Sequence, residues 1–340
     1  MVKRIFGFVL IAALLFSGIT LVAQEDQGGN VSKKAMRLIK KVDKAMASQE
    51  YDKALELCQK AIEMEPSFAV PHFKKGLILK EQQKYGEAAG SFEKALQLQQ
   101  QYPEAKNELL GTLNLLAKEM MTNKDPLKAN ELYLKIVGFS DVDEPGKRIQ
   151  TEAYYQLGVN YYSLKKSRES NEYFIKFIGT PGAESDYRDS FITANYIVGV
   201  NAYQLKLPEQ SNEYLLRFLG IDKEKQNHLQ WMPLAHFIVG SNGFDLLRKA
   251  VDQKDKTDVE GVAKLAKEDK IIVIHLSKAL ELGLNLEQIY LTLGNYYYYC
   301  RDLKSAIVNY KLLVEKFPGS PDISSYNDFL QQLEKDKENK

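Results

Sequence analysis

The sequence contains few of the residue types from which disulfide scaffolds and metal sites are built. Among its 340 residues there are two cysteines, Cys58 and Cys300, and four histidines. Two cysteines are too few for a disulfide scaffold, and they lack the CxxC or Cys/His spacing of a structural zinc site. We therefore expect neither a metal site nor a bound cofactor.

An excess of charge of either sign is also missing. Lysine and arginine number 46 against 45 aspartate and glutamate residues, which gives a net charge of +1. Proteins that bind nucleic acid usually carry a strongly basic domain or stripe, so we do not expect nucleic acid as a partner. With 44% hydrophobic residues and 10 prolines, the chain has enough apolar material for a large folded body.

Motifs of catalysis and of phosphate binding are absent from the sequence. It has no HExxH, no GxSxG, and neither a GxxxxGK[ST] nor a GxGxxG loop. Ser163 to Lys166 fits S-x-x-K, but so short a motif often matches by chance. No segment alternates apolar and polar residues with period two, as a half-buried strand does. We therefore expect an all-α fold. We also expect no catalytic residues, and hence a protein that is not an enzyme.

The first 23 residues have the pattern of a signal peptide. A basic start at Lys3 and Arg4 precedes an apolar run over 5–16, and small residues lead to Ala23 before a polar linker over 24–34. This order of segments is typical of cleaved export signals. The alternative is an uncleaved anchor, because 5–23 is nearly as long as the roughly 20 residues that cross a bilayer. We expect a periplasmic or secreted protein that keeps no stable membrane span after cleavage.

The same repeated pattern, typical of helices, occurs near both ends of the chain. Small and large residues recur after 34 positions, where Val42, Ala54, Cys58 and Ala61 correspond to Gly76, Ala88, Phe92 and Ala95. Near the C-terminus the pattern returns as Tyr290, Leu293, Gly294 and Tyr297, followed by Ala306, Tyr310 and Pro318. A period of 34 with these residue types resembles the tetratricopeptide repeat family.

The resemblance implies a right-handed superhelical solenoid of antiparallel helix pairs. About seven such repeats and a C-terminal capping helix would account for most of the chain. Within a pair, we expect the helices to approach closely where Gly76 meets Ala88 and where Gly294 meets Ala306. Stacked neighbours would complete a core that one pair cannot bury alone.

The middle of the chain repeats with a longer period of 41. Residues 155–162 match 196–203, and both match 237–244, with a glycine and an asparagine at constant places in each. The asparagines are Asn160, Asn201 and Asn242. A buried amide needs a partner, so we expect a hydrogen-bond ladder between repeats; contact with a ligand is the alternative.

These periods divide the chain into segments. Repeats 1 and 2 occupy 35–102, a degenerate third repeat occupies 103–146, and three longer repeats occupy 147–286. A seventh repeat at 287–320 precedes a capping helix and polar tail at 321–340. The sixth repeat contains a charged insertion at 252–270, which we interpret as a solvated loop or helix end; a docking element for a partner is the alternative. Since five repeats separate the two cysteines and disulfide Cα atoms lie within about 7 Å, we expect two free thiols.

The resemblance also implies a binding surface on the first helix of each repeat, along the concave side of the superhelix. Carried over through the glycine of each repeat, this surface would consist of Tyr155, Tyr162, Tyr196, Tyr203, Phe237, Phe244, Leu291, Asn295 and Tyr298. Aromatic side chains are common at binding hot spots, although they also support helices in the core. We expect a scaffold that binds a protein or peptide; a binder of a glycan or small molecule and an accessory subunit of an enzyme are the alternatives.

Overall fold

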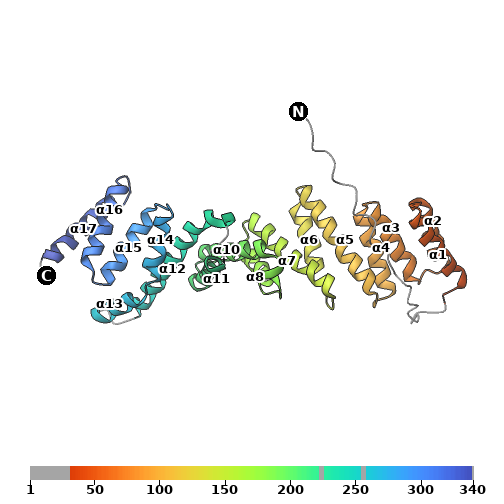
Figure 1. The fold of residues 1–340 in the computed structure, drawn as a ribbon, viewed down its shortest axis with the longest axis horizontal. Helices are drawn as coiled ribbons and strands as arrows, with labels where there is room; N and C mark the ends of the chain where they lie inside the picture. The colour runs from red at the N-terminus through yellow and green to blue at the C-terminus, as the bar shows by residue number, and fades with distance from the viewer. Residues whose placement is uncertain (1–30, 222–225, 254–257, 339–340) are drawn as a thin grey trace, which may run out of the picture. The chain divides into compact units, whose positions relative to one another are not determined.

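The computed structural model of the protein describes residues 31–221, 226–253 and 258–338. Within these ranges the chain forms seventeen α-helices and one 3₁₀ helix and no β-strand (Figure 1). The expectation of an all-helical fold is therefore confirmed. The expected signal peptide and most of the polar linker lie outside the described residues. The chain divides into two compact units, 1–112 and 113–340.

The first unit consists of two helix pairs and the start of a longer helix. The helices are α1 (Lys33–Ala47), α2 (Tyr51–Met64), α3 (Ala69–Glu81), α4 (Tyr85–Leu98) and α5 (Pro103–Thr122), which contains the boundary between the units. Helix α1 packs against α2 and α3 against α4, and α2 contacts α3 between the pairs. This is the alternation that stacked repeats require.

The second unit continues the alternation. Its helices are α6 (Pro126–Val137), α7 (Glu144–Ser163), α8 (Ser167–Ile178), α9 (Ala183–Asp186), α10 (Arg188–Gln204), α11 (Pro208–Ile221), η1 (Gln226–Trp231), α12 (Met232–Asp252), α13 (Val259–Glu268), α14 (Ile271–Glu281), α15 (Glu287–Tyr299), α16 (Leu303–Lys316) and α17 (Ile323–Glu338). The pairs within repeats are α7 with α8, α10 with α11, α12 with α14, and α15 with α16. Neighbouring pairs meet through α6 and α7, α8 and α10, α11 and α12, and α14 and α15.

A glycine in the first helix of a pair lies against one large side chain of the second helix. A Cβ atom added at Gly76 would come 2.6 Å from the Phe92 ring, and one added at Gly158 would come 2.6 Å from Phe174. The same pairing joins Gly199 to Leu215, Gly240 to Leu276 and Gly294 to Tyr310. The atoms nearest these glycines thus belong to large side chains of the facing helix, which fill the space beside the close approach of the two helices.

The charged insertion of the sixth repeat contains a helix. Helix α13 buries Ala263 and Ala266 and packs against α12 and α15. Asp258 caps its N-terminus, with Oδ1 accepting a hydrogen bond from the Gly261 amide at 2.9 Å. The interpretation of 252–270 as a solvated loop or helix end is therefore wrong for this part, because two small apolar residues three positions apart are enough to seat a short helix on its neighbours.

The last helix covers the end of the array. Helix α17 packs against α16 and buries Leu333. Near its N-terminus, the hydroxyls of Ser320 and Tyr326 both donate hydrogen bonds to Oε1 of Glu287 on α15, each at 2.9 Å. The expected C-terminal capping helix is confirmed, and it is anchored by polar contacts as well as by apolar packing.

Candidate partner-binding surface

The expected surface residues fall into two rows on the first helices, and the first row is packed. Its members precede the glycine of their helix by three positions and are Tyr155, Tyr196, Phe237 and Leu291. The Tyr155 ring centroid lies 5.7 Å from that of Phe174 and 5.2 Å from that of Phe177. The Tyr196 ring lies 5.2 Å from Phe218 and stacks on Trp231 at 4.7 Å. Phe237 is only 8% exposed, so this row mainly joins the two helices of each repeat.

The second row contains the one exposed aromatic side chain of the expected surface. Its members follow the glycine by four positions and are Tyr162, Tyr203, Phe244 and Tyr298. Tyr162 is 43% exposed, and the other three are partly exposed, as Tyr155, Tyr196 and Leu291 of the first row are. The Phe244 ring lies 5.9 Å from that of Tyr299 on α15, and the Tyr298 ring lies 5.4 Å from that of Phe329 on α17. This row therefore combines contacts between neighbouring repeats with solvent-facing aromatic area.

Burial raises the pKa of two phenols, Tyr196 of the first row and Tyr203 of the second. Burial, with the Tyr162 phenol nearby, raises the pKa of Tyr196 to about 12. Burial also raises the pKa of Tyr203, and the carboxylate of Asp245 on α12 acts in the same direction. The hydroxyls of Tyr196 and Tyr203 therefore remain donors and acceptors of hydrogen bonds, and that of Tyr203 lies near the Asp245 carboxylate.

Asn295, the polar member of the expected surface, is held by its own repeat. Its Oδ1 accepts a hydrogen bond from the Tyr310 hydroxyl at 2.8 Å, across the contact between α15 and α16. The same tyrosine ring lies against Gly294. The amide oxygen of Asn295 is thus engaged within the repeat.

The three recurrent asparagines form hydrogen bonds between repeats. Asn160 Nδ2 donates to Asn130 Oδ1 at 2.7 Å, Asn201 Nδ2 to Asn171 Oδ1 at 2.9 Å, and Asn242 Nδ2 to Asn212 Oδ1 at 2.9 Å. Their exposed fractions are only 1%, 0% and 2%. The expected ladder is confirmed, and burial keeps these amides away from any ligand on the surface.

Contacts between side chains hold the helices of the first unit together. Asp43 Oδ1 pairs with Lys74 Nζ at 2.7 Å. The Phe73 ring lies 5.8 Å from that of Phe92 and 5.0 Å from that of Tyr102. In the second unit, Glu152 on α7 accepts from Asn114 at 2.9 Å and pairs with Lys118 at 2.7 Å. Sequence reasoning missed these polar links because the partners lie on different repeats and share no motif.

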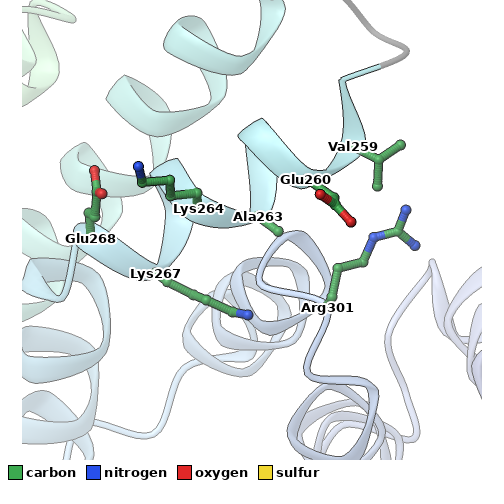
Figure 2. Close-up of a pocket in the computed structure, with 7 residues that line it drawn as sticks. All are labelled: Val259, Glu260, Ala263, Lys264, Lys267, Glu268 and Arg301. Carbon is green, nitrogen blue, oxygen red and sulfur yellow. The ribbon is translucent and has the colours of Figure 1, made fainter.

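A shallow hollow of about 550 Å³ lies between α13 and the turn after α15 (Figure 2). Val259, Glu260, Ala263, Lys264, Lys267 and Glu268 line one side, and Arg301 lines the other. Figure 2 shows the side chains of Glu260, Lys267 and Arg301 directed toward the space between the two segments. Because charges of both signs line the hollow, its electrostatics favour no single class of ligand.

Within 31–221, 226–253 and 258–338, no group of three or more His, Cys, Asp or Glu side chains is placed to hold a metal ion. None of the helices in the part of the chain that the structure describes is long and apolar enough to cross a membrane.

Comparisons with known proteins identify one of the repeats directly. Residues 71–102 match the family model described as the tetratricopeptide repeat. This match covers α3 and α4, the pair in which Gly76 contacts Phe92. No curated protein matches the sequence significantly.

Several solved structures are similar to the chain at low sequence identity. One, from a functional characterisation of Pseudomonas aeruginosa pilF, is 16% identical and covers 76% of this chain and 96% of its own, with a TM-score of 0.36. The C-terminal part of a repeat-containing protein from Cytophaga hutchinsonii is 13% identical over 84% of this chain and 98% of its own, with a TM-score of 0.37. YrrB, described as a protein with an unusual peptide-binding site, is 20% identical over 56% of this chain and 87% of its own, with a TM-score of 0.32.

The close contact of the matched repeat recurs elsewhere in the fold. The contact of Gly76 with Phe92 in the matched pair has counterparts in four further pairs, the last of them between Gly294 and Tyr310. Antiparallel helix pairs are the unit that the tetratricopeptide pattern encodes. Residues 71–102 therefore form a tetratricopeptide repeat, and the other helix pairs share its close contact.

Proposed function

We propose that the chain is an exported, non-enzymatic scaffold that binds a protein or peptide partner through the second row of aromatic side chains. The observation that carries this proposal is the exposure of Tyr162 at the start of this row. Tyr155 and Tyr196 are packed on the second helices of their repeats, whereas Tyr162 is 43% exposed at the corresponding later position. Tyr162 is therefore the aromatic side chain of the expected surface at which a partner has most room.

The chemistry of this row suits a polypeptide partner. Tyrosine offers a large apolar ring together with a hydroxyl that forms hydrogen bonds, and it loses little conformational entropy on binding. Tyr162, Tyr203 and Phe244 lie on α7, α10 and α12, one on each of three successive repeats. A partner that follows the row would meet one aromatic anchor per repeat.

Export is supported by the sequence of the first 23 residues, with its basic start and apolar run. Intact-mass measurement of the protein from its native cell tests this part separately. We expect a chain that begins near Gln24; an intact N-terminus in the membrane fraction would instead indicate an uncleaved anchor.

The binding function is tested by capture of partners with variants of the second row. Wild-type protein and the double variant Tyr162→Ala/Tyr203→Ala are immobilised and exposed to cell-envelope extract, and the retained proteins are identified by mass spectrometry. We expect a defined protein that the wild type retains and the double variant loses. Tyr173→Ala is the matched control, because Tyr173 is a partly exposed tyrosine on a second helix, α8.

Equal retention by the double variant and the wild type would contradict the proposal. The same aromatic side chains also suit the rings of a glycan, which is the alternative ligand. Binding to a glycan array that depends on Tyr162 and Tyr203, without a retained protein, would favour that alternative.

A further inference from the structure

Two histidines on the helices of the sixth repeat face each other. His236 lies on α12 and His275 on α14, and their Nδ1 atoms are 2.9 Å apart. The ring centroids are 4.8 Å apart with an interplanar angle of 38°. Both rings are only partly buried, so small solutes have access to them.

The two imidazole rings are joined by a hydrogen bond between their Nδ1 atoms. At 2.9 Å, one Nδ1 donates a proton to the other, which leaves an unprotonated ring nitrogen between the two helices.

We propose that His236 and His275 together bind a divalent transition-metal ion, of the copper(II) or nickel(II) type, through their Nδ1 atoms. Metal–imidazole bonds are about 2.0–2.1 Å long, so two nitrogens at right angles on one ion lie about 2.9 Å apart. A right angle between neighbouring ligands is the geometry of tetragonal copper(II) and nickel(II) sites. Tetrahedral zinc would need the nitrogens about 3.3–3.4 Å apart, so the observed spacing favours the tetragonal ions.

The proton balance of this site is simple. One Nδ1 carries the proton of the hydrogen bond between the rings. When the ion binds, both Nδ1 lone pairs coordinate it, so this proton moves to Nε2 of the same ring. Water molecules would complete the coordination sphere, since no cluster of three ligating side chains occurs among the described residues. The charged groups that act on His236 are Lys278 and Glu281, both on α14. The ion would thus join α12 to α14 at a place distinct from the aromatic rows.

Titration calorimetry with copper(II) and nickel(II) salts on the full chain without an affinity tag tests the proposal. We expect one ion per chain, and at least a tenfold loss of affinity in both His236→Gln and His275→Gln. Glutamine retains a hydrogen-bonding side chain of similar length but is a poor metal ligand. His72→Gln is the control, because His72 is also a partly buried histidine but lies on α3 in the other unit.

Electron paramagnetic resonance of the copper(II) complex provides a second readout. We expect an axial signal with coupling to two nitrogens, lost or reduced to one nitrogen in either variant, while thermal melts show that the variants remain folded. Absence of binding by the wild type, or unchanged affinity in both His variants, would overturn the proposal. Zinc binding tighter than nickel binding would overturn the assignment to tetragonal ions.

Discussion

Asn201 on α10 donates a hydrogen bond from Nδ2 to Oδ1 of Asn171 on α8, at 2.9 Å and between two buried side chains. The same Nδ2 lies 3.3 Å from Ser170 Oγ, and Asn171 Nδ2 donates in turn to the Val198 carbonyl at 3.3 Å. A small apolar residue would fill this place without polar partners. The amides instead link the register of one repeat to that of the next, because a shift along the helices would break both hydrogen bonds.

Replacing Asn201 with alanine should destabilise the protein by about 1–3 kcal/mol, because Asn171 Oδ1 then loses its partner inside the core. The double variant Asn171→Ala/Asn201→Ala should cost less than the sum of the single variants, since neither orphan remains. Urea unfolding of the four proteins measures this coupling. Additive costs would show that the two amides do not act as a pair.

Substitution of a glycine in the first helix of a pair should destabilise the protein, and an open glycine on α4 offers a matched control. Alanine at Gly158 would place its Cβ 2.6 Å from the Phe174 ring, whose atoms are fully buried, so we expect a loss of about 1–3 kcal/mol from overpacking. Gly90 on α4 has no atom within 4 Å of an added Cβ. Alanine there should stabilise the protein by about 0.5–1 kcal/mol, because glycine is a poor helix former. Thermal unfolding distinguishes the two, and destabilisation by Gly90→Ala would contradict the helix-propensity argument.

The regular parts of the fold and the asparagine ladder could be predicted from the sequence because duplication repeats the same contacts at a fixed spacing. The period of 41 marked Asn160, Asn201 and Asn242, and their partners Asn130, Asn171 and Asn212 are also 41 positions apart. The contacts of Gly76 with Phe92 and of Gly294 with Tyr310 could not be predicted, because spacing alone does not tell which large side chain of the facing helix fills the gap.

Contacts between residues on different helices could not be predicted, since no motif joins them. His236 and His275 lie 39 positions apart, with the insertion that contains α13 between them. The division of the aromatic surface into a packed and an open row also depended on packing, because Tyr155 and Tyr162 are chemically the same residue. The sequence pattern placed both on one helix but did not determine how much of each ring the second helix covers.

The two cysteines should be free but unreactive in the folded protein. Cys58 is fully buried, and burial raises the pKa of its thiol to about 12; burial also raises the pKa of Cys300. Since the thiolate is the reactive form, both should react with a disulfide reagent at pH 8 much more slowly than a free cysteine does. After unfolding without reductant, the same titration should count two thiols. A count of zero would reveal a disulfide and contradict the expectation of free thiols.

Substitution should destabilise the protein much more at Tyr196 in the first row than at Tyr162 in the second row. Tyr196→Ala removes a ring that packs on Phe218 and stacks on Trp231, and we expect a loss of about 2–4 kcal/mol, somewhat below the range for a fully buried aromatic residue. Tyr162→Ala removes a ring that is 43% exposed, and its effect should stay within about 0.5 kcal/mol. Urea unfolding of the two variants beside the wild type measures the difference. If Tyr162→Ala destabilises the protein as much as Tyr196→Ala does, the second row is part of the core and is not available to a partner.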